Sequence, residues 1–481
     1  MDQRKISYLV LGILLAVFAF CILWHAEWTL GDDLQFITTT AVGKPSRSWT
    51  GRGRFWPLGL VDYSILLLVP YGHTVTAHLL YNCVIMFAAV LILFSFLNKI
   101  SPKSHLINLF FMFVMFACSS FFQIHMSCIY AERMMLFLLA TFMFFYWKGE
   151  NLQSTGSYVL AFLAAAYTTY IKEPCFGMIA VIPMTNFIFR YGTLSKKDRK
   201  FNLALLGNSA IYLSIYIYRH LVKRPPKEGM YEGGWKAFSF HGVNETIDGI
   251  SAEPIMWLAL VVFLLRAGYV LFKKDRRYIF LDGLLFAAVA YVVAILGINM
   301  NSAYRIFPSV VLALPSLAHW TVYLWREKRW VSVLMMVISI FLAKNSAMTS
   351  KLQVIETWEL RKTDMPIIHE LVRQYSNGVK LIWLSKHRDL NSVKVIPVGK
   401  KWRFMVYDGF ISYHLGEQVC VLELRNNPDN IPPNSIVLCQ TGRRYEDAGF
   451  SIRIKRIQNF RHVAGAFGVK IYVHKSIQWR K

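Results

Sequence analysis

The chain has 481 residues, of which 55% are hydrophobic, 15% aromatic and only 17% charged. Soluble domains usually carry about 25% charged residues, so this composition excludes a single soluble globule and favours a membrane protein. The formal net charge is +25, but in a multispan protein a basic excess first reflects cytoplasmic loops and anionic head groups, so we expect no nucleic-acid partner.

Apolar stretches long enough to cross a hydrocarbon core of about 30 Å recur up to residue 345 and then stop. The predicted spans number eleven, at 7–25, 73–97, 105–123, 130–147, 155–171, 174–190, 201–218, 254–272, 278–297, 303–325 and 330–345. The short basic loops between them all fall on one side if the N-terminus is cytoplasmic. The sequence therefore predicts an α-helical polytopic membrane domain, residues 1–345, with the N-terminus inside and the C-terminus outside.

The first outer connection opens with EWTLGDDLQF, which places Asp32 and Asp33 just beyond the first span. Glu27 precedes the pair, and the aromatic residues Trp28 and Phe36 flank it at head-group level. Such carboxylates could act as a general base on a hydroxyl or coordinate a divalent cation. The structural alternative is that they cap the next helix or mark the return to water.

The same connection continues with GRGRFWPLG, residues 51–59, where Arg52 and Arg54 lie in a glycine-punctuated turn. Backbone and guanidinium donors in such a turn can approach a phosphate closely. Alternatively, these arginines pair with lipid head groups or with Asp32 and Asp33. The apolar stretch 58–70 that follows is too short to span, so we expect it to lie in the membrane interface.

Three further polar groups recur at outer ends of spans. They are Glu132 and Arg133 in YAERMM, Lys172 and Glu173 in YIKEPCFG, and Tyr304 and Arg305 in NMNSAYRIFPS. One interpretation is that Lys172 and Glu173 form a buried ion pair with each other and have only a structural role. The functional one is that Lys172 faces an anionic substrate and Glu173 orients it. Cations and carboxylates at one depth on one face are what a site for an amphipathic phosphate ester requires.

Residues 346–481 change character, with a helix-like segment followed by short β-rich runs such as VKLIWLS, WRFMVYDGF and SIVLCQ. They predict a soluble α/β domain, which the topology places outside. The sequence contains no G-x-x-x-x-G-K-[ST] loop, H-E-x-x-H, C-x-x-C or G-x-S-x-G motif, so a nucleotide-driven pump is not expected.

The GDD motif after the first span, the GRFWPLG stretch before the second and the KEP at an outer helix boundary resemble the GT-C membrane glycosyltransferases. Within these, the chain is most similar to the bacterial polyprenyl-phosphate-sugar-dependent enzymes, including the serotype-converting O-antigen glucosyltransferases. The resemblance covers roughly residues 1–345.

This resemblance implies transfer of a sugar, such as glucose or another hexose, from a polyprenyl-phosphate carrier to a hydroxyl of a cell-surface glycan. The reaction would take place at the periplasmic face of the inner membrane, as in O-antigen and lipopolysaccharide modification, with inversion at the anomeric carbon. Asp32 or Asp33 would be the base, and Arg54, Lys172 and Arg305 would hold the departing phosphate. No nucleotide or required metal is expected.

Two alternatives remain. A transporter or flippase of a lipid-linked sugar would share the substrate class, but it predicts charged residues at mid-depth and two related halves. The charges found here gather at helix ends, and no internal repeat is detected. A glycan polymerase or ligase is the other possibility.

Overall fold

The computed structural model describes residues 3–27, 57–66, 68–70, 72, 74–127, 130–219, 247, 250–251, 253–273, 277–297, 303–384, 423–425, 431, 434–440, 459–466 and 469–479. The chain divides into two compact units: the first comprises Met1–Leu23 and Arg47–Val354, and the second comprises Trp24–Ser46 and Ile355–Lys481. Each unit is described by itself.

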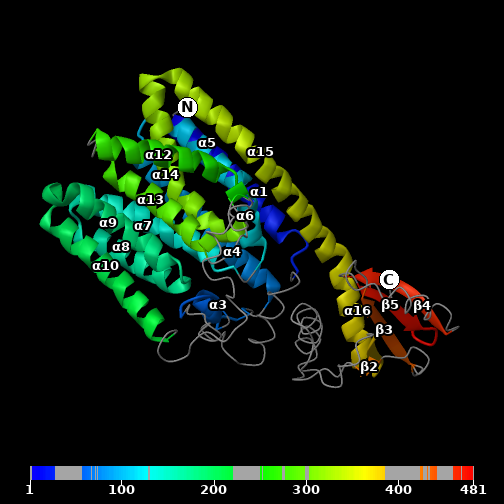
Figure 1. Ribbon diagram of the computed structural model, residues 1–481. Helices are drawn as coiled ribbons and strands as arrows, with labels where there is room; N and C mark the ends of the chain where they lie inside the picture. Colours follow the sequence, from blue (N-terminus) through cyan, green and yellow to red (C-terminus); the bar gives the residue numbers. More distant parts are fainter. Residues whose placement is uncertain are drawn as a thin grey trace. The chain divides into compact units, whose positions relative to one another are not determined.

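The first unit is helical (Figure 1). Its helices are α1 (Gln3–Leu23), α3 (Val61–Leu66), α4 (Val75–Ile100), α5 (His105–Ala117), α6 (Ser119–Met126), α7 (Glu132–Leu152), α8 (Thr155–Ile171), α9 (Cys175–Arg190), α10 (Lys196–Ile217), α12 (Ile255–Phe272), α13 (Ile279–Gly297), α14 (Ala303–Glu327) and α15 (Arg329–Glu359), with a short 3-10 helix η1 (Tyr191–Thr193).

A helix occupies each of the eleven ranges expected to span the membrane. Within the described part of the chain, six helices are long and apolar enough to cross a bilayer, or seven if the bent pair of α5 and α6 counts as one span. The chain is therefore a membrane protein with several apolar helices, and the number eleven stays a prediction.

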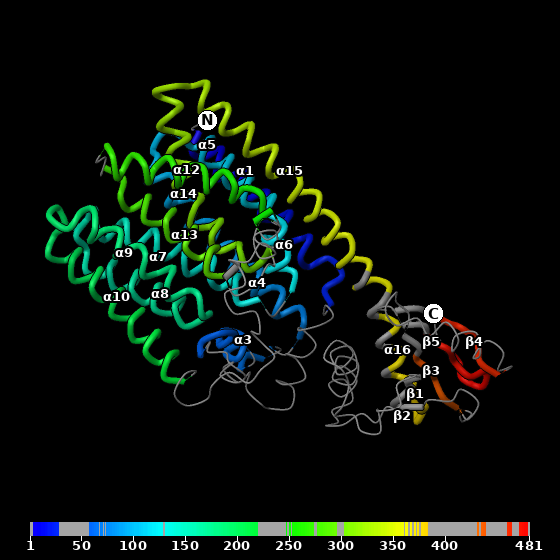
Figure 2. Tube along the Cα trace, viewed as in Figure 1, coloured from blue at the N-terminus to red at the C-terminus, as the bar shows by residue number. Residues whose placement is uncertain are grey.

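Helix α14 is the best buried of the candidate spans. In α14, 89% of the apolar window is buried, against 28% in α1. Around it, α13 packs between α9 and α14, α7 packs against α4 and α8, and α10 packs against α8 and α9, as the Cα trace also shows (Figure 2).

Serine and threonine caps fix the starts of several helices: Thr74 Oγ1 accepts from Ala77 N at 3.3 Å, and Ser154 Oγ accepts from Ser157 N at 3.3 Å.

One predicted span, 105–123, is broken into α5 and α6 with a bend of 65° at Cys118. The fully buried carboxylate of Glu253 lies at the start of α6, where it accepts hydrogen bonds from Ser120 N at 2.8 Å and Ser119 Oγ at 3.2 Å. Burial raises the pKa of the Glu253 carboxyl, whereas the hydrogen bonds from Ser120 lower it. Because the first amides of a helix have no partner within it, this carboxylate stabilises the break.

The second unit contains the remainder of α15, a π-helical turn (Leu360–Asp364) and α16 (Met365–Ser376), followed by a sheet of strand order β2-β1-β3-β5-β4. The strands are β1 (Lys380–Leu384), β2 (Glu423–Arg425), β3 (Ser435–Gln440), β4 (Phe460–Ala466) and β5 (Val469–His474). Strand β1 runs parallel to β2 and β3, and β5 is antiparallel to β3 and β4.

One face of this sheet carries the buried cluster of Ile382, Val437, Phe460 and Tyr472. The run 402–410, expected as a strand, lies outside the described residues, and β4 was not among the expected strands. Helix α15 continues past residue 345, the end of the last predicted span, to Glu359.

Candidate functional site

A buried ion pair joins two helices at the end of the bundle where α7 begins. Glu132 is the first residue of α7, and Lys172 follows the last residue of α8. The Lys172 ammonium pairs with the Glu132 carboxylate, and their side chains are only 8% and 2% exposed. The sequence suggested the adjacent Glu173 as the ion-pair partner of Lys172. In the structure the partner is Glu132, forty positions earlier.

The ring of Tyr304, in the first turn of α14, has two cations close to it. Lys172 Nζ is 5.5 Å from its centroid, and the Arg305 guanidinium carbon is 5.3 Å from it. Tyr130 packs on the same ring, with centroids 4.5 Å apart. Tyr304 and Arg305 are both half-buried. The structure therefore brings together Lys172, Tyr304 and Arg305, three of the residues singled out from the sequence.

Arg133 lies next to this group but has a different environment. Its guanidinium is fully buried, forms an ion pair with Asp62 of α3 and lies 3.6 Å from the Tyr63 ring centroid. It also donates to Tyr130 O at 2.8 Å. Breaking such a pair leaves an uncompensated buried charge and typically costs about 3–5 kcal/mol. Arg133 thus fastens α3 and Tyr130 to the start of α7.

Two further hydrogen bonds fix α3 and the residues before it. Tyr63 donates to Asn82 Oδ1 at 2.7 Å, and Leu58 N donates to Tyr170 O at 3.2 Å. The second bond ties the end of the GRGRFWPLG stretch to the chain two residues before Lys172. Arg52 and Arg54 themselves lie outside the described residues, as do Asp32 and Asp33.

Tyr291 of α13 is a site residue that the sequence did not reveal. Its side chain is fully buried, and within the described part of the chain its hydroxyl has no hydrogen-bond partner. Helix α13 packs against α9, which begins just after Lys172 and Glu173, and against α14, which carries Tyr304 and Arg305 in its first turn. A buried polar group without a partner costs about 1–3 kcal/mol, so this hydroxyl is a candidate donor to a bound ligand.

Glu173 occupies the turn between α8 and α9 and is half-buried. No group of three or more His, Cys, Asp or Glu side chains able to hold a metal occurs among the described residues. What the arrangement offers chemically is a pair of cations and a buried hydroxyl donor, which together can bind an anion such as a phosphate.

No family model and no curated protein matches this sequence. Among solved structures, the chain is similar to ArnT from Cupriavidus metallidurans bound to undecaprenyl phosphate, with a TM-score of 0.52 and 10% identity over 97% of both chains. ArnT in the apo state gives 0.49 at 9% identity over 98% of both chains. An Archaeoglobus fulgidus oligosaccharyltransferase in complex with Zn and sulfate gives 0.48 at 12% identity, over 96% of this chain and 72% of that one.

The likeness to lipid-bound ArnT shows the fold and extends over nearly the whole chain. The GT-C fold class expected from the sequence agrees with this neighbour.

Proposed function

We propose that the chain is a glycosyltransferase that moves a sugar, such as glucose or another hexose, from a polyprenyl-phosphate carrier to a hydroxyl of a surface glycan such as O-antigen. The observation that carries this proposal is that Lys172 and Arg305 both lie within 5.5 Å of the Tyr304 ring centroid, in a fold shared with a protein whose crystal structure contains undecaprenyl phosphate.

The phosphate of the donor would bind to Lys172, Arg305 and the Tyr291 hydroxyl. As the bond between the sugar and the phosphate breaks, negative charge develops on the phosphate oxygens, and preorganised cations stabilise it. Glu132 forms an ion pair with Lys172 in the structure. Since phosphate and Glu132 compete for the same ammonium, Glu132 would also help product to leave.

Arg133 would not bind the donor phosphate directly, because its guanidinium is already paired with Asp62. It would instead hold the neighbouring residues of the site in position. Arg54 and Arg52 are proposed to extend the phosphate site. The support is chain connectivity: Leu58 N donates to Tyr170 O, and Arg54 precedes Leu58 by four residues, which span at most about 14 Å. Glu173, one residue further along the chain, is proposed to orient the sugar.

The acceptor would be activated by Asp32 or Asp33, a role taken from the family resemblance. The carboxylate removes the proton of the acceptor hydroxyl, the oxygen attacks the anomeric carbon, and the bond to the phosphate oxygen breaks on the opposite side. A single displacement of this kind inverts the anomeric configuration. No metal is required in this scheme, although the two aspartates could bind a divalent cation.

The reaction is proposed to take place at the periplasmic face of the inner membrane. Basic loops on the other side support this orientation, which also puts the C-terminal unit outside. Modification of lipopolysaccharide, including serotype conversion, would be the cellular outcome.

Undecaprenyl phosphate is expected to raise the unfolding temperature of the purified protein, whereas undecaprenol, which lacks the phosphate, is not. Tyr291→Phe removes a hydroxyl that has no partner in the described structure, so we expect its basal stability to be unchanged or slightly higher. Its affinity for undecaprenyl phosphate should nevertheless fall about tenfold, because a hydrogen bond to a charged group is lost.

Titrating both lipids into both proteins while following thermal unfolding provides the measurement. Equal stabilisation of the wild type by the two lipids would argue against a phosphate site. Unchanged affinity of Tyr291→Phe would remove Tyr291 from it.

A further inference from the structure

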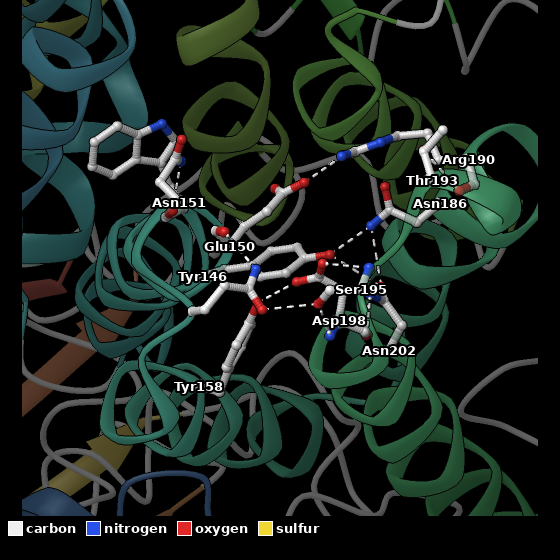
Figure 3. Close-up of polar contacts among 12 residues, drawn as sticks. Tyr146, Glu150, Asn151, Tyr158, Asn186, Arg190, Thr193, Ser195, Asp198 and Asn202 are labelled. Carbon is white, nitrogen blue, oxygen red and sulfur yellow. Dashed lines mark hydrogen bonds and ion pairs between the residues drawn. The ribbon is translucent and has the colours of Figure 1, made fainter.

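A second polar cluster lies at the other ends of the helices that form the candidate site. It joins the last turns of α7 and α9 to the first turns of α8 and α10 (Figure 3). Asn186 donates to the Tyr146 hydroxyl at 2.6 Å and to Asn202 Oδ1 at 3.1 Å. These bonds fix the spacing of α7, α9 and α10 at this end of the bundle.

The acidic side chains of the cluster are occupied within it. Asp198 accepts hydrogen bonds from the Tyr158 hydroxyl and, at 3.0 Å, from Ser195 N, while Glu150 pairs with Arg190 at 2.5 Å (Figure 3). Ser195 Oγ in turn accepts from Asp198 N, which completes a capping box at the start of α10. The amides at the start of α10 and the carboxylates of Asp198 and Glu150 therefore have their hydrogen-bond or ion-pair partners within the cluster.

Four cations at the start of α10 are left without a carboxylate. Lys196, Lys197 and Lys200 are exposed, Arg199 is half-buried, and no ion pair joins them to an acid within the described residues. Lys197 donates to Gln153 O, which leaves its charge uncompensated. Cations in the first turns of a helix also oppose its dipole. This concentration of charge is unfavourable for the isolated fold, and a bound anion would relieve it.

An apolar stripe adjoins these cations. Met184 and Ile188 lie one turn apart on α9, Tyr191 follows at the start of η1, and Leu203 lies one turn beyond Lys200 on α10; all four are between 49% and 66% exposed. The Arg199 guanidinium carbon is 4.6 Å from the Tyr191 ring centroid, so the charged and apolar parts meet. Surfaces that combine these two chemistries match a molecule with an anionic head and a hydrocarbon tail.

We propose that Lys196, Arg199 and Lys200, with the stripe of Met184, Ile188, Tyr191 and Leu203, form a binding site for an anionic phospholipid. The lipid phosphate binds the three cations, and an acyl chain lies along the stripe. A free phosphate or an acidic peptide would contact only the cations, whereas a phospholipid contacts both the cations and the adjoining apolar side chains, so a lipid fits the whole surface better. The site is separate from the proposed donor site at the beginning of α7.

The test compares two triple variants of the full-length protein in detergent, titrated with phosphatidylglycerol and followed by native mass spectrometry and thermal unfolding. One variant combines Lys196→Gln, Arg199→Gln and Lys200→Gln. The matched control combines Lys103→Gln, Lys328→Gln and Arg329→Gln, three exposed cations at the same end of the helices, where α4 ends and α15 begins. Both variants lose the same charge.

Phosphatidylglycerol affinity is expected to fall about tenfold or more in the first variant and to stay near the wild-type value in the control. A third variant, with Lys196→Arg, Arg199→Lys and Lys200→Arg, keeps the charges and should retain binding. Phosphatidylcholine and inorganic phosphate should not stabilise the wild type.

Equal losses in both triple variants would overturn the proposal, because the basic loops would then act only as a general positive surface. The same holds if inorganic phosphate or a poly-glutamate peptide reproduces the effect of phosphatidylglycerol, or if the first variant binds the lipid like the wild type.

Discussion

Replacing Lys172 by Gln is expected to slow sugar transfer about 10²–10³-fold, the usual cost of removing one group that stabilises developing negative charge. The single variant also leaves Glu132 buried without its cation, which typically costs about 3–5 kcal/mol of stability. Changing Glu132 to Gln as well removes that penalty. The double variant should therefore fold normally and still transfer sugar poorly.

Initial transfer rates and unfolding temperatures of both variants check this prediction. Lys148→Gln, at the opposite end of α7, is a matched control that loses one cation and should keep the wild-type rate. If the double variant transfers sugar as fast as the wild type, Lys172 does not hold the leaving phosphate.

The second large effect is expected at the aspartate pair. Converting the catalytic aspartate to Asn removes a general base and should reduce transfer about 10²–10⁴-fold. The same change in its neighbour should have a much smaller effect. Asp32→Asn and Asp33→Asn measured separately would therefore identify the base.

Binding of undecaprenyl phosphate provides the control for these variants, because the aspartates are proposed to act on the acceptor. Each variant should be stabilised by the lipid as the wild type is. Wild-type transfer by the variant carrying both changes would contradict the base assignment, and loss of lipid binding would assign the pair to the donor instead.

The sequence predicted the helical ranges well, since long apolar runs need no tertiary information. It did not predict the break between α5 and α6. The residue at the break is Cys118, which is neither proline nor glycine, and the carboxylate that caps α6 comes from Glu253, more than 130 positions later. Helix α15 was expected to end at residue 345 because the apolar run ends there, yet helical geometry continues into the polar sequence as far as Glu359.

For the candidate site, too, the sequence could not predict contacts between residues that are far apart in the chain. Sequence reasoning placed Glu132, Lys172, Tyr304 and Arg305 at one depth, but it could not pair Lys172 with Glu132 across two helices. The adjacent Glu173 was the only local candidate.

Two other residues of the site were missed for different reasons. Asp62 was hidden in a short stretch interpreted as interfacial, and only the fold shows that it neutralises Arg133. Tyr291 was hidden in an apolar run, where a single hydroxyl gives no periodic signal.

The protein is proposed to catalyse sugar transfer and not to transport its lipid donor. The most direct measurement incubates the purified chain in detergent with a polyprenyl-phosphate carrying a labelled hexose, starting with glucose, and a lipid-linked acceptor glycan. We predict that the label moves to the glycan while one polyprenyl phosphate is released per sugar. No transfer in detergent, together with movement of the labelled lipid across the bilayer of proteoliposomes, would contradict the proposed glycosyltransferase activity and identify a flippase.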